Sequence, residues 1–143
     1  MNRESAKAGL SIVIQSGFRS NETQKLIHES YKARNGKESA ELYSARAGYS
    51  EHETGLAIDV ASSVSSKPTG TAFSSTDEYA WLMENAHRFG FIIRYPEGKE
   101  NFTGYRFEPW HLRYVGVEFA TKLHSQNQCI EEYFQIESKY KEK

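Results

Sequence analysis

The chain has one cysteine, no long apolar run and almost no net charge. Cys129 stands alone among 143 residues, which excludes an intrachain disulfide and a zinc site built from several thiolates. No apolar stretch is long enough to cross a bilayer. The formal net charge of −1 provides no general attraction to nucleic acid or to an anionic membrane. We therefore expect no nucleic-acid partner and no membrane segment in this chain.

The start of the chain lacks the basic and apolar leader of a signal peptide. It opens directly on a helix-like stretch at residues 3–8, so we expect that an anchor, a leader or an N-terminal part of the domain precedes it in the native protein. A hydrophobic content of 38% and a charged content of 26% fit a soluble globular protein. The length predicts one domain with one core over residues 1–143, and we expect a monomer.

Helical and strand patterns alternate irregularly along the chain, which predicts the α+β class. Runs rich in β-branched and aromatic residues predict strands at 10–15, 55–60, 91–95 and 105–114. Helices are expected at 3–9, 21–34, around 41–42, 75–89, 118–126 and 130–139, with surface loops at 61–76 and 96–104. The patterns Asn21 with Gln24, and Ser75 with Glu78, predict capping boxes at two helix starts.

The segment 50–60 carries a histidine and an aspartate around a predicted strand. If residues 55–60 are a strand, Gly55, Ala57 and Asp59 share one face, and the apolar residues between them share the core face. A carboxylate among apolar neighbours is costly unless it is paired or binds a metal. His52 precedes this strand on a loop that can fold back over Asp59.

The segment 108–114 places a carboxylate three residues before a second histidine. Pro109 has no amide donor, which predicts an edge strand or an irregularity and lets Glu108 and His111 converge. Two imidazoles and one carboxylate make a three-ligand zinc site with an open fourth position. A second carboxylate beside the metal-bound water completes a hydrolase. The alternative is that these are structural groups, because lone histidines usually are.

Three motifs occur here in one order: Ser-Gly-Phe-Arg-Ser at 16–20, Ser-x-His-x-x-Gly-x-Ala-x-Asp at 50–59 and Glu-Pro-Trp-His-x-Arg at 108–113. Together they resemble the VanY-type D-alanyl-D-alanine carboxypeptidases and the related LdcB-type L,D-carboxypeptidases. Residues 81–91 and Arg94-Tyr95-Pro96 are also similar to that family. The resemblance covers nearly the whole chain and implies a small antiparallel central sheet flanked by helices, of the Hedgehog and DD-peptidase type.

The resemblance also implies a role for each matching residue, and one Zn²⁺ as cofactor. His52, Asp59 and His111 match the zinc ligands, and Glu108 matches the general base. The remaining matches are Arg19, beside the scissile carbonyl, and the peptide-contacting residues Gln24, Ser50 and Tyr95. The implied substrate is a peptidoglycan stem peptide, so an extracytoplasmic location is expected.

Four functions remain open at this point. The three peptide-contacting residues favour an L,D-carboxypeptidase that removes the terminal D-alanine of a tetrapeptide stem. The alternatives are a D,D-carboxypeptidase acting on the pentapeptide, an endopeptidase of phage-lysin type, and a non-catalytic wall-binding domain. The complete set of His52, Asp59, Glu108 and His111 argues against the last, because a binding module needs no general base.

Overall fold

The structure is a computed structural model that describes residues 1–66 and 69–136. The chain divides into two compact units, one of Met1–Ser16 with Ile58–Lys143 and one of residues 17–57. Within the described ranges, no helix combines the length and apolar character needed to cross a membrane. The helix expected at 130–139 begins as predicted but ends early, at Phe134, because Gln135 adopts a left-handed conformation with φ of 54°. Residues 137–139 lie outside the described part of the chain.

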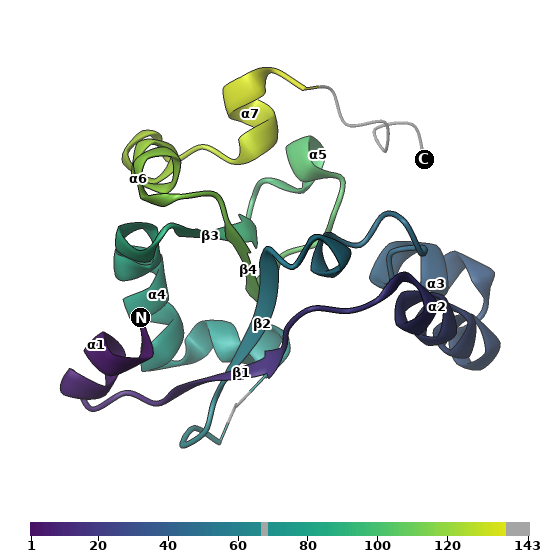
Figure 1. Ribbon diagram of the computed structural model, residues 1–143, viewed down its shortest axis with the longest axis horizontal. Helices are drawn as coiled ribbons and strands as arrows, with labels where there is room; N and C mark the ends of the chain where they lie inside the picture. The colour runs from purple at the N-terminus through teal and green to yellow at the C-terminus, as the bar shows by residue number, and fades with distance from the viewer. Residues whose placement is uncertain (67–68, 137–143) are drawn as a thin grey trace. The chain divides into compact units, whose positions relative to one another are not determined.

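Four strands form one sheet in the order β1-β2-β4-β3 (Figure 1). Strand β1 pairs antiparallel with β2, and β3 pairs antiparallel with β4. The α+β class with an antiparallel central sheet is thus confirmed. The strands are β1 (Ile12–Ser16), β2 (Ala57–Ser62), β3 (Phe91–Tyr95) and β4 (Glu108–Tyr114).

Helices and short 3-10 turns pack on this sheet in the larger unit. Helix α6 lies against β3 and the turn η3, and α4 lies against η2 and η3. The bounds are α1 (Asn2–Lys7), η2 (Thr71–Ser75), α4 (Asp77–Asn85), η3 (Ala86–Phe89), α5 (Glu100–Thr103), α6 (Val117–Gln126) and α7 (Ile130–Phe134).

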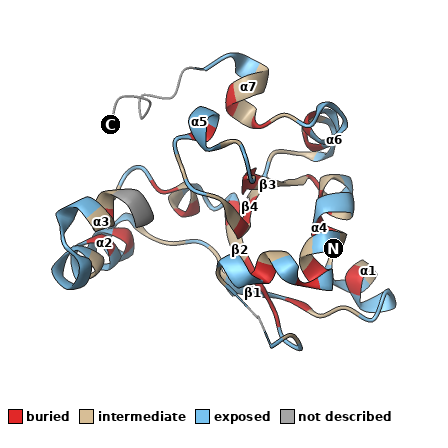
Figure 2. Cartoon of the chain, turned by 180° about the vertical axis from the view of Figure 1, so that it is seen from behind, coloured by how far each residue is buried: buried red, intermediate tan, exposed pale blue. Residues whose placement is uncertain are grey.

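The core lies between the strands and α4. Figure 2 shows buried residues along the strands and on α4. Its buried members are Ile12, Val60, Phe73, Leu82, Ala86 and Leu112. Burying one such aliphatic or aromatic side chain stabilises the fold by about 1.5–3 kcal/mol. The loop predicted at 61–76 therefore contributes to the core, because η2 inserts Phe73 into it.

Both predicted capping boxes are wrong by one residue. The α2 cap is Ser20, whose side chain accepts a hydrogen bond from the backbone N–H of Thr23. The α4 cap is Thr76, which accepts from the N–H of Tyr79. In each case the hydroxyl three residues before the amide has the required geometry. Neighbouring polar residues made the sequence ambiguous at both helix starts.

Strand β2 begins two residues later than predicted. Gly55 adopts a left-handed conformation with φ of 72° and ends the turn η1 (Glu51–Thr54), so the strand cannot include it. Leu56 is consequently 42% exposed rather than on the core face. Ile58 and Val60 do pack on the core, as the alternation predicts.

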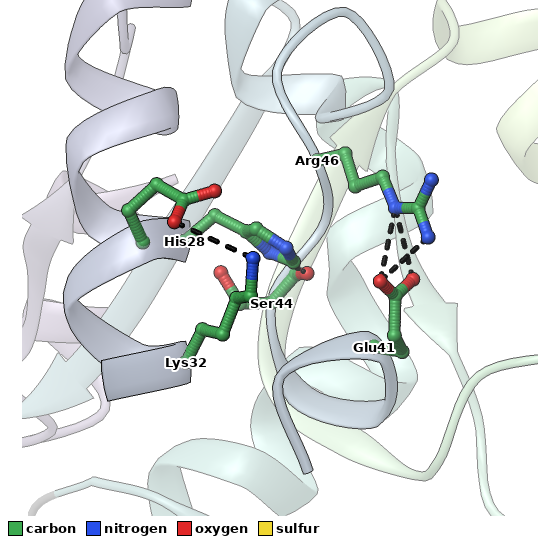
Figure 3. A network of polar contacts seen from close by, with 6 residues as sticks. His28, Lys32, Glu41, Ser44 and Arg46 are labelled. Atoms are coloured by element: carbon green, nitrogen blue, oxygen red, sulfur yellow. Dashed lines mark hydrogen bonds and ion pairs between the residues drawn. The ribbon is translucent and has the colours of Figure 1, made fainter. Parts of the chain in front are cut away.

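Two helices form the body of the smaller unit. Helix α2 (Asn21–Asn35) ends at Gly36 as predicted, and α3 (Lys37–Tyr43) packs against it. Figure 3 shows how the segment after α3 is held: the ring of His28 hydrogen-bonds the carbonyl of Ser44 at 2.9 Å, and Arg46 makes a two-pronged ion pair with Glu41. These contacts fix the start of the loop that leads to Ser50 and His52.

A tight contact at Gly90 gives a test of the packing between η3 and the end of β4. Gly90 has φ of 81°, and a Cβ there would lie 2.6 Å from the Tyr114 ring and 3.1 Å from the Gly116 backbone. Gly98 has a similar φ of 77° with open space around it. We predict that Gly90→Ala is less stable than Gly98→Ala by about 1–3 kcal/mol, the usual cost of overpacking. Urea denaturation of both variants measures the difference, and equal midpoints would contradict it.

Candidate active site

Asp59 and His111 meet directly in the larger unit. Asp59 lies on β2 and His111 on the neighbouring β4, and the His111 Nδ1 is 2.9 Å from an Asp59 carboxylate oxygen. His111 is 5% exposed. A carboxylate and an imidazole held this close inside a fold share either a proton or a cation. The structure thus joins residues that lie 52 positions apart in the sequence.

An aromatic stack covers the other side of the His111 ring. The Tyr95 ring lies against it with centroids 5.2 Å apart and planes 16° apart. Tyr105 stacks in turn on Tyr95 at 4.5 Å. Stacked rings fix each other's orientation and add about 0.5–1.5 kcal/mol per pair beyond their burial. The orientation of His111 is therefore set by Asp59 and by Tyr95.

The ladder between β3 and β4 is interrupted beside these residues. Ile93 pairs with Leu112 and Tyr95 pairs with Glu108, so one residue of β3 faces three of β4. The irregularity predicted from Pro109 is confirmed, and the edge position is wrong because β4 lies between β2 and β3. In a regular strand, residues three apart point to opposite faces. Here Glu108 is the register partner of Tyr95, while His111 stacks on the ring of the same tyrosine.

In the smaller unit, His52 is held by the turn that carries Arg19. The ring Nδ1 of His52 lies 2.8 Å from the carbonyl oxygen of Gly17, and the backbone N–H of Arg19 donates to the His52 carbonyl at 3.2 Å. A carbonyl can only accept, so Nδ1 carries the hydrogen. The neutral ring then presents its lone pair at Nε2, the form in which histidine binds metals.

Gln24 links Arg19 to the loop after α3. Its side-chain oxygen accepts from Arg19 Nη1 at 2.8 Å, and its amide nitrogen donates to the carbonyl of Ala45. Gln24 is 1% exposed, and Ser50 is 8% exposed at the start of η1. The residues expected to contact the peptide thus include one that orients the arginine. Tyr95, the third of them, belongs to the larger unit.

Glu53 holds the histidine turn to the start of α2. One carboxylate oxygen accepts from the Asn21 side chain at 2.9 Å, and the other accepts from the backbone N–H of Gly48 at 2.8 Å. The bond from Asn21, supported by that from Gly48, keeps the pKa of Glu53 below its usual range against the opposing effect of desolvation. This glutamate therefore stays ionised in mildly acidic conditions.

The donors of the larger unit suit a zinc ion. Two ligands of a tetrahedral zinc with bonds of about 2.1 Å lie roughly 3.4 Å apart. The distance of 2.9 Å between His111 Nδ1 and the Asp59 oxygen is close to that separation. A small increase in this distance would let both atoms bind one ion. Nitrogen and carboxylate oxygen are also the ligand types of catalytic zinc sites.

Comparison with known proteins identifies the family. Residues 1–117 match the VanY family, described as D-alanyl-D-alanine carboxypeptidase. The chain belongs to this family. A putative carboxypeptidase, YodJ of Bacillus subtilis, is 42% identical over 129 residues, which are 90% of this chain and 47% of YodJ. The chain spans about half the length of the curated relatives it matches.

Solved structures of VanY-family proteins share the fold. The LdcB LD-carboxypeptidase is 40% identical with a TM-score of 0.86, over 95% of this chain and 64% of that one. A D,D-pentapeptidase VanY mutant in complex with Zn(II) is 40% identical with a TM-score of 0.77, over 93% and 76%. VanYB in complex with D-alanine-D-alanine is 39% identical with a TM-score of 0.79, over 96% and 77%. The expected DD-peptidase-like fold is thereby confirmed.

Several residues around the VanY-family motifs were not predicted from the sequence. The carbonyl of Gly17 orients the His52 ring, and Tyr105 extends the stack on Tyr95. A backbone carbonyl leaves no mark in the sequence. Tyr105 stands at the start of a predicted strand, and aromatic residues are common in strands whatever their role.

The buried bonds of Gln24 generate a prediction about stability. Gln24→Met keeps the length of the side chain but leaves the carbonyl of Ala45 without its donor. An unsatisfied buried polar group costs about 1–3 kcal/mol, so we expect a loss of that size. Gln126→Met, at the exposed end of α6, is the matched control and should stay within about 0.5 kcal/mol of wild type. Chemical denaturation measures both, and equal stability would mean that Gln24 has no structural role.

Proposed function

We propose that this VanY-family chain is a zinc-dependent carboxypeptidase that removes the terminal D-alanine of peptidoglycan stem peptides. The metal ligands are His52, Asp59 and His111, each of which offers one ring nitrogen or carboxylate oxygen. The observation that carries the proposal is the direct pairing of Asp59 with His111 in a member of this family. A VanY structure in complex with Zn(II), 40% identical to this chain, supports the choice of metal.

The covalent chain supports the inclusion of His52. Gly17, whose carbonyl orients the His52 ring, directly follows Ser16. Ser16 is the register partner of Asp59 in the pairing of β1 with β2. One peptide bond therefore separates the residue that holds His52 from the residue that pairs with Asp59. The lone pair at Nε2 is the donor that His52 contributes.

Glu108 is the proposed general base. A zinc ion held by these ligands would lower the pKa of a bound water toward neutrality and would polarise the scissile carbonyl. Glu108 accepts the proton as water attacks that carbonyl, and it then delivers the proton to the leaving amine of D-alanine. The register pairing of Glu108 with Tyr95, whose ring stacks on His111, supports this role. The C–N bond breaks and one water is consumed.

We propose that Arg19 stabilises negative charge on the substrate. Its guanidinium is always protonated and donates through a planar fork, which suits the oxyanion or the terminal carboxylate. Gln24 holds one of its nitrogens at 2.8 Å, so the fork is oriented before substrate arrives. Ser50 and Tyr95 complete the proposed peptide contacts.

Among the possible stems we favour the tetrapeptide, cut by L,D-carboxypeptidase activity. The support is the motif match at Gln24, Ser50 and Tyr95 together with a TM-score of 0.86 to LdcB. The D,D-carboxypeptidase is the second candidate, because the VanY structure with Zn(II) is described as a D,D-pentapeptidase. An endopeptidase or a wall-binding domain would leave the terminal D-alanine in place. Peptidoglycan as substrate places the protein outside the cytoplasm, and we propose that location and a monomer.

The roles of Glu108 and Asp59 separate in one experiment. We predict about one zinc per wild-type chain and a similar content in Glu108→Gln, which keeps the shape of the side chain. Glu108→Gln should lose roughly 10²–10⁴-fold in turnover, the usual contribution of a general base. Asp59→Ala should lose most of its zinc, because it removes a ligand. Elemental analysis and release of D-alanine measure the two quantities.

Two results would contradict these roles. Loss of zinc from Glu108→Gln would make Glu108 a ligand, and wild-type turnover in that variant would remove it from the mechanism. Glu118→Gln is the control, since it removes an exposed carboxylate of α6 that the mechanism does not use.

The free C-terminus of the substrate provides the next test. A terminal carboxylate accepts charge-assisted hydrogen bonds, roughly twice as strong as neutral ones, from groups such as Arg19. Amidation removes the charge and leaves the scissile bond intact. We predict that a tetrapeptide stem releases D-alanine at least about tenfold faster than its amide, since about 1.4 kcal/mol corresponds to a factor of ten.

Chromatography of tetrapeptide, pentapeptide and both amides, at one zinc concentration and pH, resolves the alternatives. Faster cleavage of the pentapeptide would favour the D,D-carboxypeptidase. Equal cleavage of acid and amide, or a cut within the stem, would favour the endopeptidase. No cleavage by zinc-loaded protein would favour the binding domain.

A further inference from the structure

A buried ion pair ties the C-terminal helix to the strand that carries Tyr95. Arg94 on β3 and Glu131 on α7 are each 9% exposed. The two guanidinium nitrogens Nη1 and Nη2 donate to separate carboxylate oxygens at 3.0 and 2.6 Å. This two-pronged geometry is the most directional that an ion pair offers. Glu131 lies beyond residues 1–117, the part of the chain that matches the family.

The guanidinium of Arg94 also lies on the face of Tyr95. Its central carbon is 4.8 Å from the ring centroid, within the range of a cation–π contact. The Tyr95 ring stacks on His111. Contacts therefore run without a gap from Glu131 through Arg94 and Tyr95 to His111.

Arg94 occupies the point where the β3–β4 ladder is broken. It is the single residue of β3 opposite Pro109, Trp110 and His111. The regular register is interrupted there, so ladder pairing alone does not set the geometry of this part of the strand. A rigid side-chain contact at this position has more effect on the geometry than it would in a regular ladder.

Helix α7 is anchored well enough to act as a support. Lys99 makes an ion pair of 2.7 Å with Glu132, whose other carboxylate oxygen accepts from the backbone N–H of Cys129 at the helix start. A helix of five residues is not stable alone, so these contacts hold it.

We propose that Arg94 and Glu131 are positioning residues of the active site: their ion pair holds Tyr95 flat against His111 and so fixes the orientation of that histidine. The inference rests on the proposed role of His111 as a ligand. If the pair served only to stabilise the fold, an apolar pair of similar volume would replace it without effect on His111.

The test compares five variants with the wild type by NMR of the histidine ring protons in zinc-free protein at one pH. Glu131→Gln breaks the charge pairing, and the double variant Arg94→Met with Glu131→Leu replaces the pair by apolar contacts. Glu118→Gln, at an exposed position of α6, is the control for the loss of a carboxylate. Tyr95→Leu gives the shift of an unstacked His111 ring, and His111→Gln assigns its signal.

We expect the His111 signal to move toward its Tyr95→Leu position in Glu131→Gln and in the double variant, and to stay in place in Glu118→Gln. Zinc affinity, measured by chelator competition, should fall about tenfold in the first two, as for other residues that orient a ligand.

A wild-type His111 signal and zinc affinity in the folded double variant would overturn the proposal. That variant decides the matter even if Glu131→Gln fails to fold. The NMR comparison needs no peptide, so failure of the proposed function, seen as a wild-type chain that cuts no stem, is separately detectable.

Discussion

Strand β4 must fill the core and supply two polar side chains from one short segment. Leu112 is fully buried, while Glu108 and His111 are the proposed base and ligand. A regular pleat would send residues 108 and 111 to opposite faces. The break opposite Arg94 removes that constraint, and Pro109, which has no N–H to leave unpaired, is suited to the position. The pairing of His111 with Asp59 and its stacking on Tyr95 both depend on this irregularity.

Each polar group of the candidate site is oriented by a neighbouring group. His52 is fixed by a backbone carbonyl, His111 by a carboxylate and a tyrosine ring, and Arg19 by Gln24. A buried donor or acceptor costs more unpaired than a paired one contributes, so each partner restricts its neighbour to one arrangement. Such orientation before binding is what a hydrolase requires of its ligands and its charged groups.

The sequence was informative where one physical rule acted alone. The strand 91–95 and the end of α2 at Gly36 were predicted correctly. A run of β-branched and aromatic residues favours a strand, and a glycine after a helical pattern favours the end of the helix. The caps at Ser20 and Thr76 were missed because adjacent residues have the same chemistry. Pro109 indicated an irregularity, yet only the register shows how many residues it spans. The three ligands and the base came from motifs, and their roles remain predictions.

The residues that the sequence could not reveal share one property: each acts on a side chain far away in the chain. Glu131 contacts Arg94 across 37 positions, and Gly17 contacts His52 across 35. Local periodicity contains no information about such pairs, because it depends on residues within one or two turns. From the sequence alone, a glutamate in a helix as short as α7 is expected to be exposed to solvent. Its burial against the Arg94 guanidinium, one residue from the stacked Tyr95, connects α7 to the ring of His111.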